Sequence, residues 1–291
     1  MTNYQDFGFG GEEFRGEITT VPYCQFLNAN NQKYGIAITP ANAELAKFRA
    51  IDSWKVIEHE FSDGTAETLF VCRQPRLVIL NRSQPMMSDG TITIPYNKVK
   101  LEEGQFKAFS YAIVWFLDHN NQPISELPFR LKCSGYAGLT FLKNYSYYNN
   151  PNSFCKHFLQ VYKSLTGDRA IDKNDVFYAH AVYHPNLVRQ KATSTYNGQS
   201  SFAVMTESFI EPTPANFGSL IIKNGSSVSY KIKQLLETTK SWLKTEVVES
   251  GVESQSVEQD FPQNAITAYQ QPETSIPNGI EAGLTPEPIK F

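Results

Sequence analysis

Cationic and aromatic side chains are interleaved along several segments of the chain. Proteins that bind single-stranded nucleic acid use this combination, because Lys and Arg follow the phosphates while rings stack on unpaired bases, each contributing roughly 1–3 kcal/mol. The pattern therefore predicts a nucleic-acid-binding surface. Its candidate residues are Arg73, Arg76, Arg82, Lys98, Lys100, Arg130, Lys132, Lys143, Tyr145, Tyr147, Tyr148, Arg189, Lys191 and Tyr196. An alternative stays open, since a β-rich protein also buries rings and leaves Lys and Arg on solvated faces.

Other chemistries find less support in the sequence. His180 and His184 are four residues apart, but the aromatic and β-branched residues around them favour a strand, and no third metal ligand is identifiable. No G-x-S-x-G nucleophile pattern occurs. Glu58 and Glu60 alternate with apolar residues, as on the solvated face of a strand, and do not indicate paired catalytic carboxylates. We therefore predict no catalytic residue, no metal site and no cofactor, in a protein that is not an enzyme.

Cysteine usage and hydropathy indicate the compartment. Cys24, Cys72, Cys133 and Cys155 lie in apolar stretches without a C-x-x-C pair, which predicts buried free thiols and no zinc site. No run approaches about eighteen consecutive apolar residues, so no membrane span is expected. The first residues lack the basic and apolar regions of a secretory signal peptide. These features predict a cytoplasmic protein.

The elements that position the candidate residues follow from hydrophobic periodicity and turn signals. Strands are expected at residues 18–27, 34–38, 54–61, 67–72, 74–81, 91–96, 110–117, 127–133, 176–184, 187–196 and 201–210. Helices are expected at residues 41–48, 154–165 and 228–243, and a loop is expected after Phe141. The predicted fold class is α+β: mostly antiparallel β, as a barrel or twisted sheet with an OB-like form among the options, and two or three packed helices.

The composition changes near Thr245. Residues 246–291 hold eight acidic residues, one basic residue and five prolines, without a persistent helical or strand period. Such a segment cannot bury enough apolar surface to offset its ordering entropy, so it is predicted to be a disordered tail of net charge −7 on a body of net charge +4. The expected organisation is a flexible leader at 1–16, a domain at 17–245, either undivided or split near 120–127, and the tail at 246–291.

The tail ends in the sequence PEPIKF, which resembles the acidic, Phe-terminated tails of bacterial and phage single-stranded-DNA-binding proteins. That resemblance implies that Pro288, Ile289 and Phe291 dock replication or recombination proteins. Lys290 and the sparse acidity near the end depart from the dense acidic run usual in that family.

The folded part resembles a second family. The segments WKVIEHEFSDG and CRQPRLVILNRSQPMM are similar to those of a family of cyanobacterial, often plasmid-associated, proteins over most of residues 15–245. This resemblance implies a plasmid or phage context and no particular activity.

These observations favour a non-enzymatic accessory protein of replication or recombination that binds single-stranded DNA or RNA. The alternative is a structural or assembly protein of a phage-like or plasmid element that acts through protein interfaces. A third class is an enzyme whose site residues are dispersed along the chain. No membrane partner is expected, and a homo-oligomer remains an option.

Overall fold

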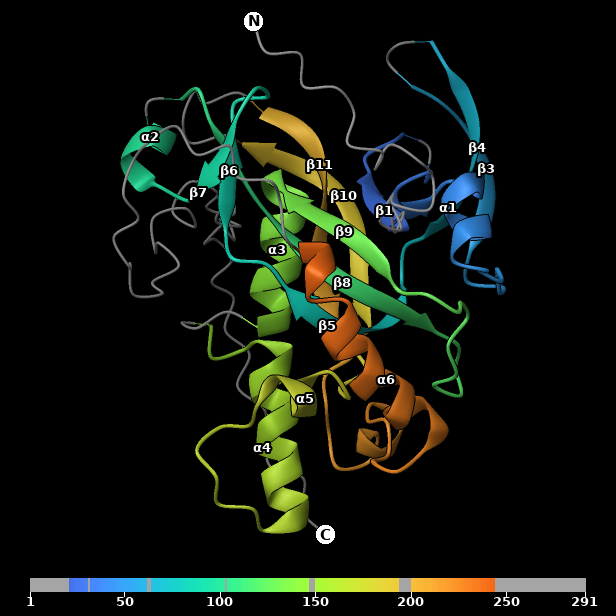
Figure 1. Cartoon of the computed structure of the whole chain (residues 1–291), viewed down its shortest axis with the longest axis vertical. Helices are drawn as coiled ribbons and strands as arrows, with labels where there is room; N and C mark the ends of the chain where they lie inside the picture. The colour runs from blue at the N-terminus through green and yellow to red at the C-terminus, as the bar shows by residue number, and fades with distance from the viewer. Residues whose placement is uncertain are drawn as a thin grey trace, which may run out of the picture.

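The computed structural model describes residues 21–30, 32–61, 64–102, 104–146, 150–193 and 200–243. It confirms the predicted class, an α+β chain in which most strand pairs are antiparallel and the main sheet is twisted (Figure 1). The strands are β1 (Tyr23–Leu27), β2 (Gly35–Ile38), β3 (Lys55–Glu60), β4 (Ala66–Cys72), β5 (Arg76–Arg82), β6 (Met86–Ser88), β7 (Thr93–Pro95), β8 (Lys107–Leu117), β9 (Phe129–Ser134), β10 (Pro185–Thr193) and β11 (Ser200–Phe209). The helices are α1 (Pro40–Leu45), α2 (Lys98–Glu102), α3 (Gly135–Ser146), α4 (Phe154–Thr166), α5 (Asp175–Tyr178), α6 (Ser227–Thr238) and the 3-10 turns η2 (Phe217–Ser219) and η3 (Ser241–Leu243).

Nine strands form one open sheet. Eight of them follow the order β3-β4-β2-β1-β9-β8-β6-β7, and β5 also pairs with β8. Only β1 and β9 run parallel within it, pairing at two positions. β10 and β11 form a separate antiparallel hairpin. Since β3 and β7 end the sheet without pairing to each other, the described residues form a twisted sheet, and the barrel and OB-like options do not apply to them.

Both faces of the sheet are covered (Figure 1). The β10–β11 hairpin and α3 pack on one face, which we call the hairpin face, and α4 packs beside them. α6 crosses the opposite face, which we call the α6 face. β8 contributes side chains to a hydrophobic core on each face of the sheet. Every second residue from Ala112 to Phe116 packs on the hairpin face, and every second residue from Ile113 to Leu117 packs under α6. This alternation is the period-2 pattern expected of a strand buried on both sides.

The three predicted helices are confirmed, and capping residues explain where they begin or end. Thr39 accepts a hydrogen bond from the backbone N–H of Asn42 at the start of α1, where Pro40 occupies the first turn. Ser226 accepts from the N–H of Ser229 in the same way at the start of α6. Gly167 ends α4 with φ of 71°, a conformation that favours glycine.

The loop expected after Phe141 is instead the second half of α3. Gly135 has φ of 56°, which lets the chain turn directly from β9 into the helix. At Gly138 the helix approaches β9 so closely that a Cβ would lie 2.3 Å from the carbonyl carbon of Cys133. Phe141 and Tyr145, four residues apart, both point into the core. Tertiary packing therefore outweighs the weak helix propensity of this aromatic segment.

The strand expected at 176–184 is also wrong. Asn174 accepts a hydrogen bond from the N–H of Phe177 and begins the single turn of α5. Beyond α5, Tyr183 forms only an isolated bridge with Leu77 of β5. The local cap therefore prevails over the β-branched and aromatic composition of this segment.

Several predictions concern residues outside the described part of the chain. These are the leader at 1–16, the tail with Pro288, Ile289 and Phe291, and the candidates Tyr147, Tyr148 and Tyr196. Near the predicted division at 120–127, β8 and β9 flank the segment and pair antiparallel along six positions.

Candidate nucleic-acid interface

A row of cations and rings lies on the α6 face of the sheet, beyond the part that α6 covers. In the register of β8 and β9, Arg130 pairs with Ile113, which belongs to the core under α6, and Lys132 pairs with Tyr111. Paired positions point to the same face, so Arg130, Lys132 and Tyr111 share the α6 face. Tyr23 of β1 pairs with Arg130 and extends the row. We call the resulting set the strand patch: Tyr23, Lys107, Phe109, Tyr111, Arg130 and Lys132.

Each of the two β9 cations in the strand patch covers a ring. The Arg130 guanidinium carbon lies 4.8 Å from the centre of the Tyr111 ring, and the Lys132 ammonium lies 4.5 Å from that of Phe109. The Phe109 and Tyr111 rings meet edge to face at 5.4 Å. Phe109 is 7% exposed, whereas Tyr23 is 49% exposed. The patch therefore offers one open ring and two rings that the cations shield.

The backbone under the strand patch is fixed by polar contacts. The N–H of Tyr111 donates to the Ser83 hydroxyl, and the N–H of Ser83 donates to the Tyr111 carbonyl, both at 2.8 Å. These bonds tie β8 to the segment between β5 and β6. Nη1 of Arg130 donates to the carbonyl of Trp242 in η3 at 3.4 Å. The rings and cations thus project from a rigid sheet.

Arg82 and Tyr145, two further candidates, lie on the hairpin face. The Tyr145 ring is 2% exposed, is stacked at 6.0 Å on Phe154 and lies 5.2 Å from the Tyr183 ring. Burial raises the pKa of the Tyr145 phenol well above its usual value. The Arg82 guanidinium carbon lies 5.7 Å from the same ring. The expectation that Tyr145 offers a surface for stacking is therefore wrong, because the helical register of α3 turns this ring into the core.

Five more candidates lie away from the strand patch. Lys98 and Lys100 are exposed on α2, near the β7 edge. Arg189 and Lys191 lie on β10. The Arg189 guanidinium carbon is 4.6 Å from the Phe202 ring centre, and its Nε donates to the Asn28 side chain. Lys143, also predicted, is half-buried on α3. The predicted set is thus spread over several surfaces.

Arg73 and Arg76 line a cleft of about 870 Å³ at the end of β8. Arg76 is held by neutral acceptors: its Nη2 donates to the side chain of Asn121 at 2.6 Å and to the carbonyl of Ser219 at 2.8 Å, and its Nε donates to the carbonyl of Asp118. His184 also lines the cleft, and its Nε2 lies 3.1 Å from the carbonyl of Gln74. These cations are therefore separate from the strand patch.

His180 forms a hydrogen-bonded pair with Ser229. Its Nδ1 lies 2.6 Å from the Val176 carbonyl, so Nδ1 carries the proton and Nε2, at 2.9 Å, accepts from the Ser229 hydroxyl. Burial lowers the pKa of His180. A serine beside a histidine base is the arrangement of a nucleophile, but Ser229 is fully buried and does not line the adjacent cavity, which only His180 of the pair reaches. The pair therefore joins the segment after α5 to α6.

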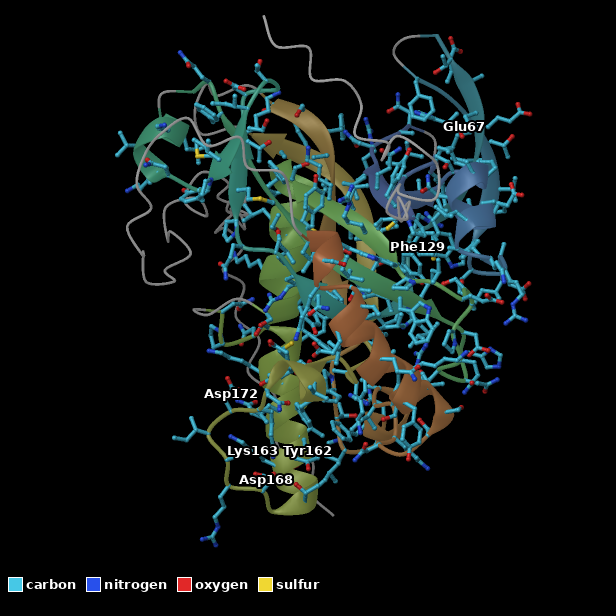
Figure 2. All side chains as sticks on the ribbon, in the orientation of Figure 1. Glu67, Phe129, Tyr162, Lys163, Asp168 and Asp172 are labelled. Atoms are coloured by element: carbon cyan, nitrogen blue, oxygen red, sulfur yellow. The ribbon has the colours of Figure 1, made fainter. Side chains whose placement is uncertain are left out.

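A second cavity of about 580 Å³ lies beside this pair. Tyr162 and Asp172, two of its lining residues, are seen with Lys163 and Asp168 around the lower part of α4, away from Phe129 of β9 (Figure 2). Lys173 reaches Asp168 in an ion pair across the loop after α4. The cations near this cavity are thus already paired or bonded, since Lys233 donates to the side chain of Asn224 at 2.9 Å.

The four cysteines are buried free thiols, as predicted. Burial raises the pKa of Cys133 and of Cys155 to about 12, which keeps both thiols protonated. Within the described residues, no three His, Cys, Asp or Glu side chains gather in a group able to hold a metal ion. No helix in the described part of the chain is long and apolar enough to span a membrane.

Three rings of the strand patch were not among the candidates: Tyr23, Phe109 and Tyr111. The sequence contains a usable signal, because Lys107, Phe109 and Tyr111 alternate with smaller residues at the start of β8. Assigning that face also requires the pairing of β8 with β9 and of β1 with β9, which periodicity alone does not give.

Comparison with known proteins identifies a family. No curated protein and no solved structure matches the chain. Residues 19–255, which include every described element, match the family described as a domain of unknown function (DUF5895). The chain belongs to this DUF5895 family.

Proposed function

We propose that this chain binds single-stranded nucleic acid, DNA or RNA, through the strand patch. The observation that carries the proposal is the register of β8, β9 and β1, which gathers Tyr23, Phe109 and Tyr111 with Arg130 and Lys132 on one face. An open sheet face with rings and cations suits unpaired bases, since the rings stack on the bases and the cations follow the backbone.

The energetics favour a rearrangement on binding. Arg130 and Lys132 now cover Tyr111 and Phe109, and each such cation–ring contact contributes about 0.5–1 kcal/mol at an exposed site. Moving a cation to a phosphate frees the ring, and a stacked base then contributes roughly 1–3 kcal/mol. Release of condensed counterions adds a further favourable contribution at low salt. The gain exceeds the loss, so the half-buried Tyr111 ring is available to a strand once Arg130 moves, whereas the Phe109 ring stays buried.

The wider role that we propose is a non-enzymatic accessory function in replication or recombination. It would be carried out in the cytoplasm, with a plasmid or phage element as its context. The tail residues Pro288, Ile289 and Phe291 would contact replication or recombination proteins, as the resemblance of the tail implies.

A salt titration tests the binding site. Anisotropy of a labelled oligonucleotide of about 20 nucleotides is measured from about 50 to 200 mM salt with the full chain. The double variant Arg130→Gln, Lys132→Gln should bind more weakly and lower the slope of log K against log salt by about 1.4, because each lost phosphate contact removes about 0.7 for single strands.

The matched control is Lys163→Gln, Arg169→Gln, which removes two charges from α4 and the loop after it. This variant should keep the slope of the unaltered chain. Equal slopes for both double variants would refute the strand patch. An unaltered chain that binds no oligonucleotide, but self-associates independently of salt, would instead favour the structural or assembly role.

A further inference from the structure

Two arginines without carboxylate partners meet at one cleft. The cleft lies where the β4–β5 turn, the end of β8 and the start of β10 come together, and both Arg73 and Arg76 line it. Among the described residues neither arginine forms an ion pair, and Arg76 is partly desolvated, which lowers its pKa. Cations withdrawn from water are normally paired with an anion. Asp52 and Asp118 also line the cleft, so its three cations, with Lys55 as the third, outnumber its two carboxylates.

Asp118 partly opposes the effect of burial on the Arg76 pKa, but its carboxylate is already bound by backbone N–H groups. Oδ1 of Asp118 accepts hydrogen bonds from the N–H groups of Asn120 and Gln122, both at 2.8 Å. Arg76 instead binds the backbone carbonyl of Asp118. Its guanidinium is thus held in place by neutral oxygens while its charge is not cancelled by an ion pair. A guanidinium fixed in this way is suited to the oxygens of a phosphate.

Arg73 is positioned by a ring. Its guanidinium carbon lies 5.6 Å from the centre of the Tyr34 ring, and its own backbone carbonyl accepts from the N–H of Leu187. The cleft therefore presents one arginine fixed by carbonyls and one held over an aromatic face, with Lys55 as a third cation at its edge.

The rest of the cleft is larger and less polar than a phosphate requires. At about 870 Å³ it is within the size range of small-molecule sites. Ile51 and Ile57 are among its apolar lining residues, and Gln32 contributes a side-chain amide. His184 uses Nε2 to donate to the carbonyl of Gln74, which leaves Nδ1 as an acceptor for a hydroxyl. These groups fit a phosphate joined to a sugar and a ring.

We infer that the cleft binds a nucleoside monophosphate, with its phosphate between Arg73 and Arg76 and its base against Ile51 and Ile57. The His184 imidazole accepts a hydrogen bond from the sugar. Burial and the neighbouring Arg76 lower the pKa of His184, so the imidazole is neutral and able to accept at neutral pH. This site is separate from the strand patch and does not depend on the function proposed for it.

Calorimetric titration of the full chain tests the inference. Nucleoside 5′-monophosphates, ribose 5-phosphate and inorganic phosphate are each titrated up to about 1 mM. Nucleoside monophosphates should bind at least about 10-fold more tightly than the other two. Arg73→Gln should weaken that binding about 10-fold or more, since it removes a charge-assisted contact, and Arg73→Lys should retain part of it.

Two variants keep the outcomes distinguishable. Arg169→Gln, which removes a charge outside the cleft, should leave nucleotide binding unchanged. Ala50→Trp adds bulk at the exposed edge of the cleft and should weaken nucleotide binding. Thermal unfolding checks that each variant is folded.

Three results would overturn the inference. The first is no detectable binding of any nucleoside monophosphate. The second is a folded Arg73→Gln variant with unchanged affinity. The third is ribose 5-phosphate binding as tightly as the nucleotides, which would leave the base without a site.

Discussion

Replacing Tyr145 distinguishes a core ring from a binding ring. In Tyr145→Ala the ring that contacts Phe154 and Tyr183 is removed, and α3 loses a buried ring contact with α4. The side chain is 2% exposed, so the change leaves a buried cavity between these rings. Large-to-small changes of buried aromatic residues cost about 3–5 kcal/mol, and we expect that range for the free energy of unfolding here.

Two matched variants separate the parts of this effect. Tyr145→Phe keeps the ring and removes only the hydroxyl, whose 3.5 Å contact with the Tyr178 carbonyl is long, so the cost should stay below about 1 kcal/mol. Tyr230→Ala removes a ring that is 62% exposed on α6 and should change stability by no more than about 0.5 kcal/mol.

The assay is urea unfolding followed by circular dichroism, with oligonucleotide anisotropy on the same samples. Tyr145→Ala should lower the unfolding midpoint strongly, and thermal unfolding should shift by roughly 6–20 °C. Tyr145→Phe should bind oligonucleotide as the unaltered chain does. If Tyr145→Ala instead costs less than about 1 kcal/mol and abolishes binding in a folded protein, the assignment of this ring to the core is refuted.

Three further predictions concern a histidine, a glycine and the tail. Because burial lowers the pKa of His180 in the folded state, the unfolded chain binds more protons below about pH 6.5, and stability should fall as the pH falls. In His180→Gln, the free energy of unfolding measured with urea between about pH 5 and 8 should depend less on pH than in the unaltered chain. The same pH dependence in both proteins would contradict this role of His180. Gly138→Ala should destabilise the fold by about 1–3 kcal/mol, because its Cβ would meet the Cys133 backbone. An unchanged thermal unfolding temperature would show instead that α3 can move away from β9 at no cost in stability. Truncation after Thr245 removes a segment of net charge −7 and should tighten oligonucleotide binding at about 50 mM salt, whereas equal affinity would argue against competition by the tail.

The strands were largely predictable because their patterns are local. Residues 74–81 and 110–117 are apolar and β-branched runs bounded by turn residues, and they correspond to β5 and β8. The helix α3 was not predictable in the same way. Its aromatic residues have weak helix propensity, and the close approach at Gly138 that stabilises it depends on β9 being in place.

The candidate sites were predictable by residue type but not by location. Arg130 and Lys132 lie together on the α6 face, whereas Tyr145 is turned inward by a helix that the sequence does not reveal. Arg73 and Arg76 were expected on the same surface as Arg130 and Lys132, but they line a separate cleft. His184, more than a hundred positions later in the sequence, lines that cleft with them. Contacts over such separations are set by the topology of the sheet, which periodicity does not specify.

The short parallel pairing of β1 with β9 divides the main sheet into two hydrogen-bonded blocks, β1–β4 and β5–β9. Ring contacts join the blocks across this seam: the Trp54 ring lies 4.9 Å from that of Phe116, and the Phe48 ring lies 6.0 Å from that of Phe129. Backbone hydrogen bonds also cross it, among them those from the N–H of Arg130 to Pro22 and from the N–H of Glu126 to Ala46. Stabilisation by apolar packing weakens on cooling and under pressure, whereas the backbone hydrogen bonds between paired strands do not share that dependence. Amide hydrogens of β1–β4 should therefore exchange as one cooperative unit, ahead of those in β8, when the protein is cooled or compressed. Since Tyr23 lies on one side of the seam and Arg130 on the other, opening of the seam would separate the open ring of the strand patch from its cations.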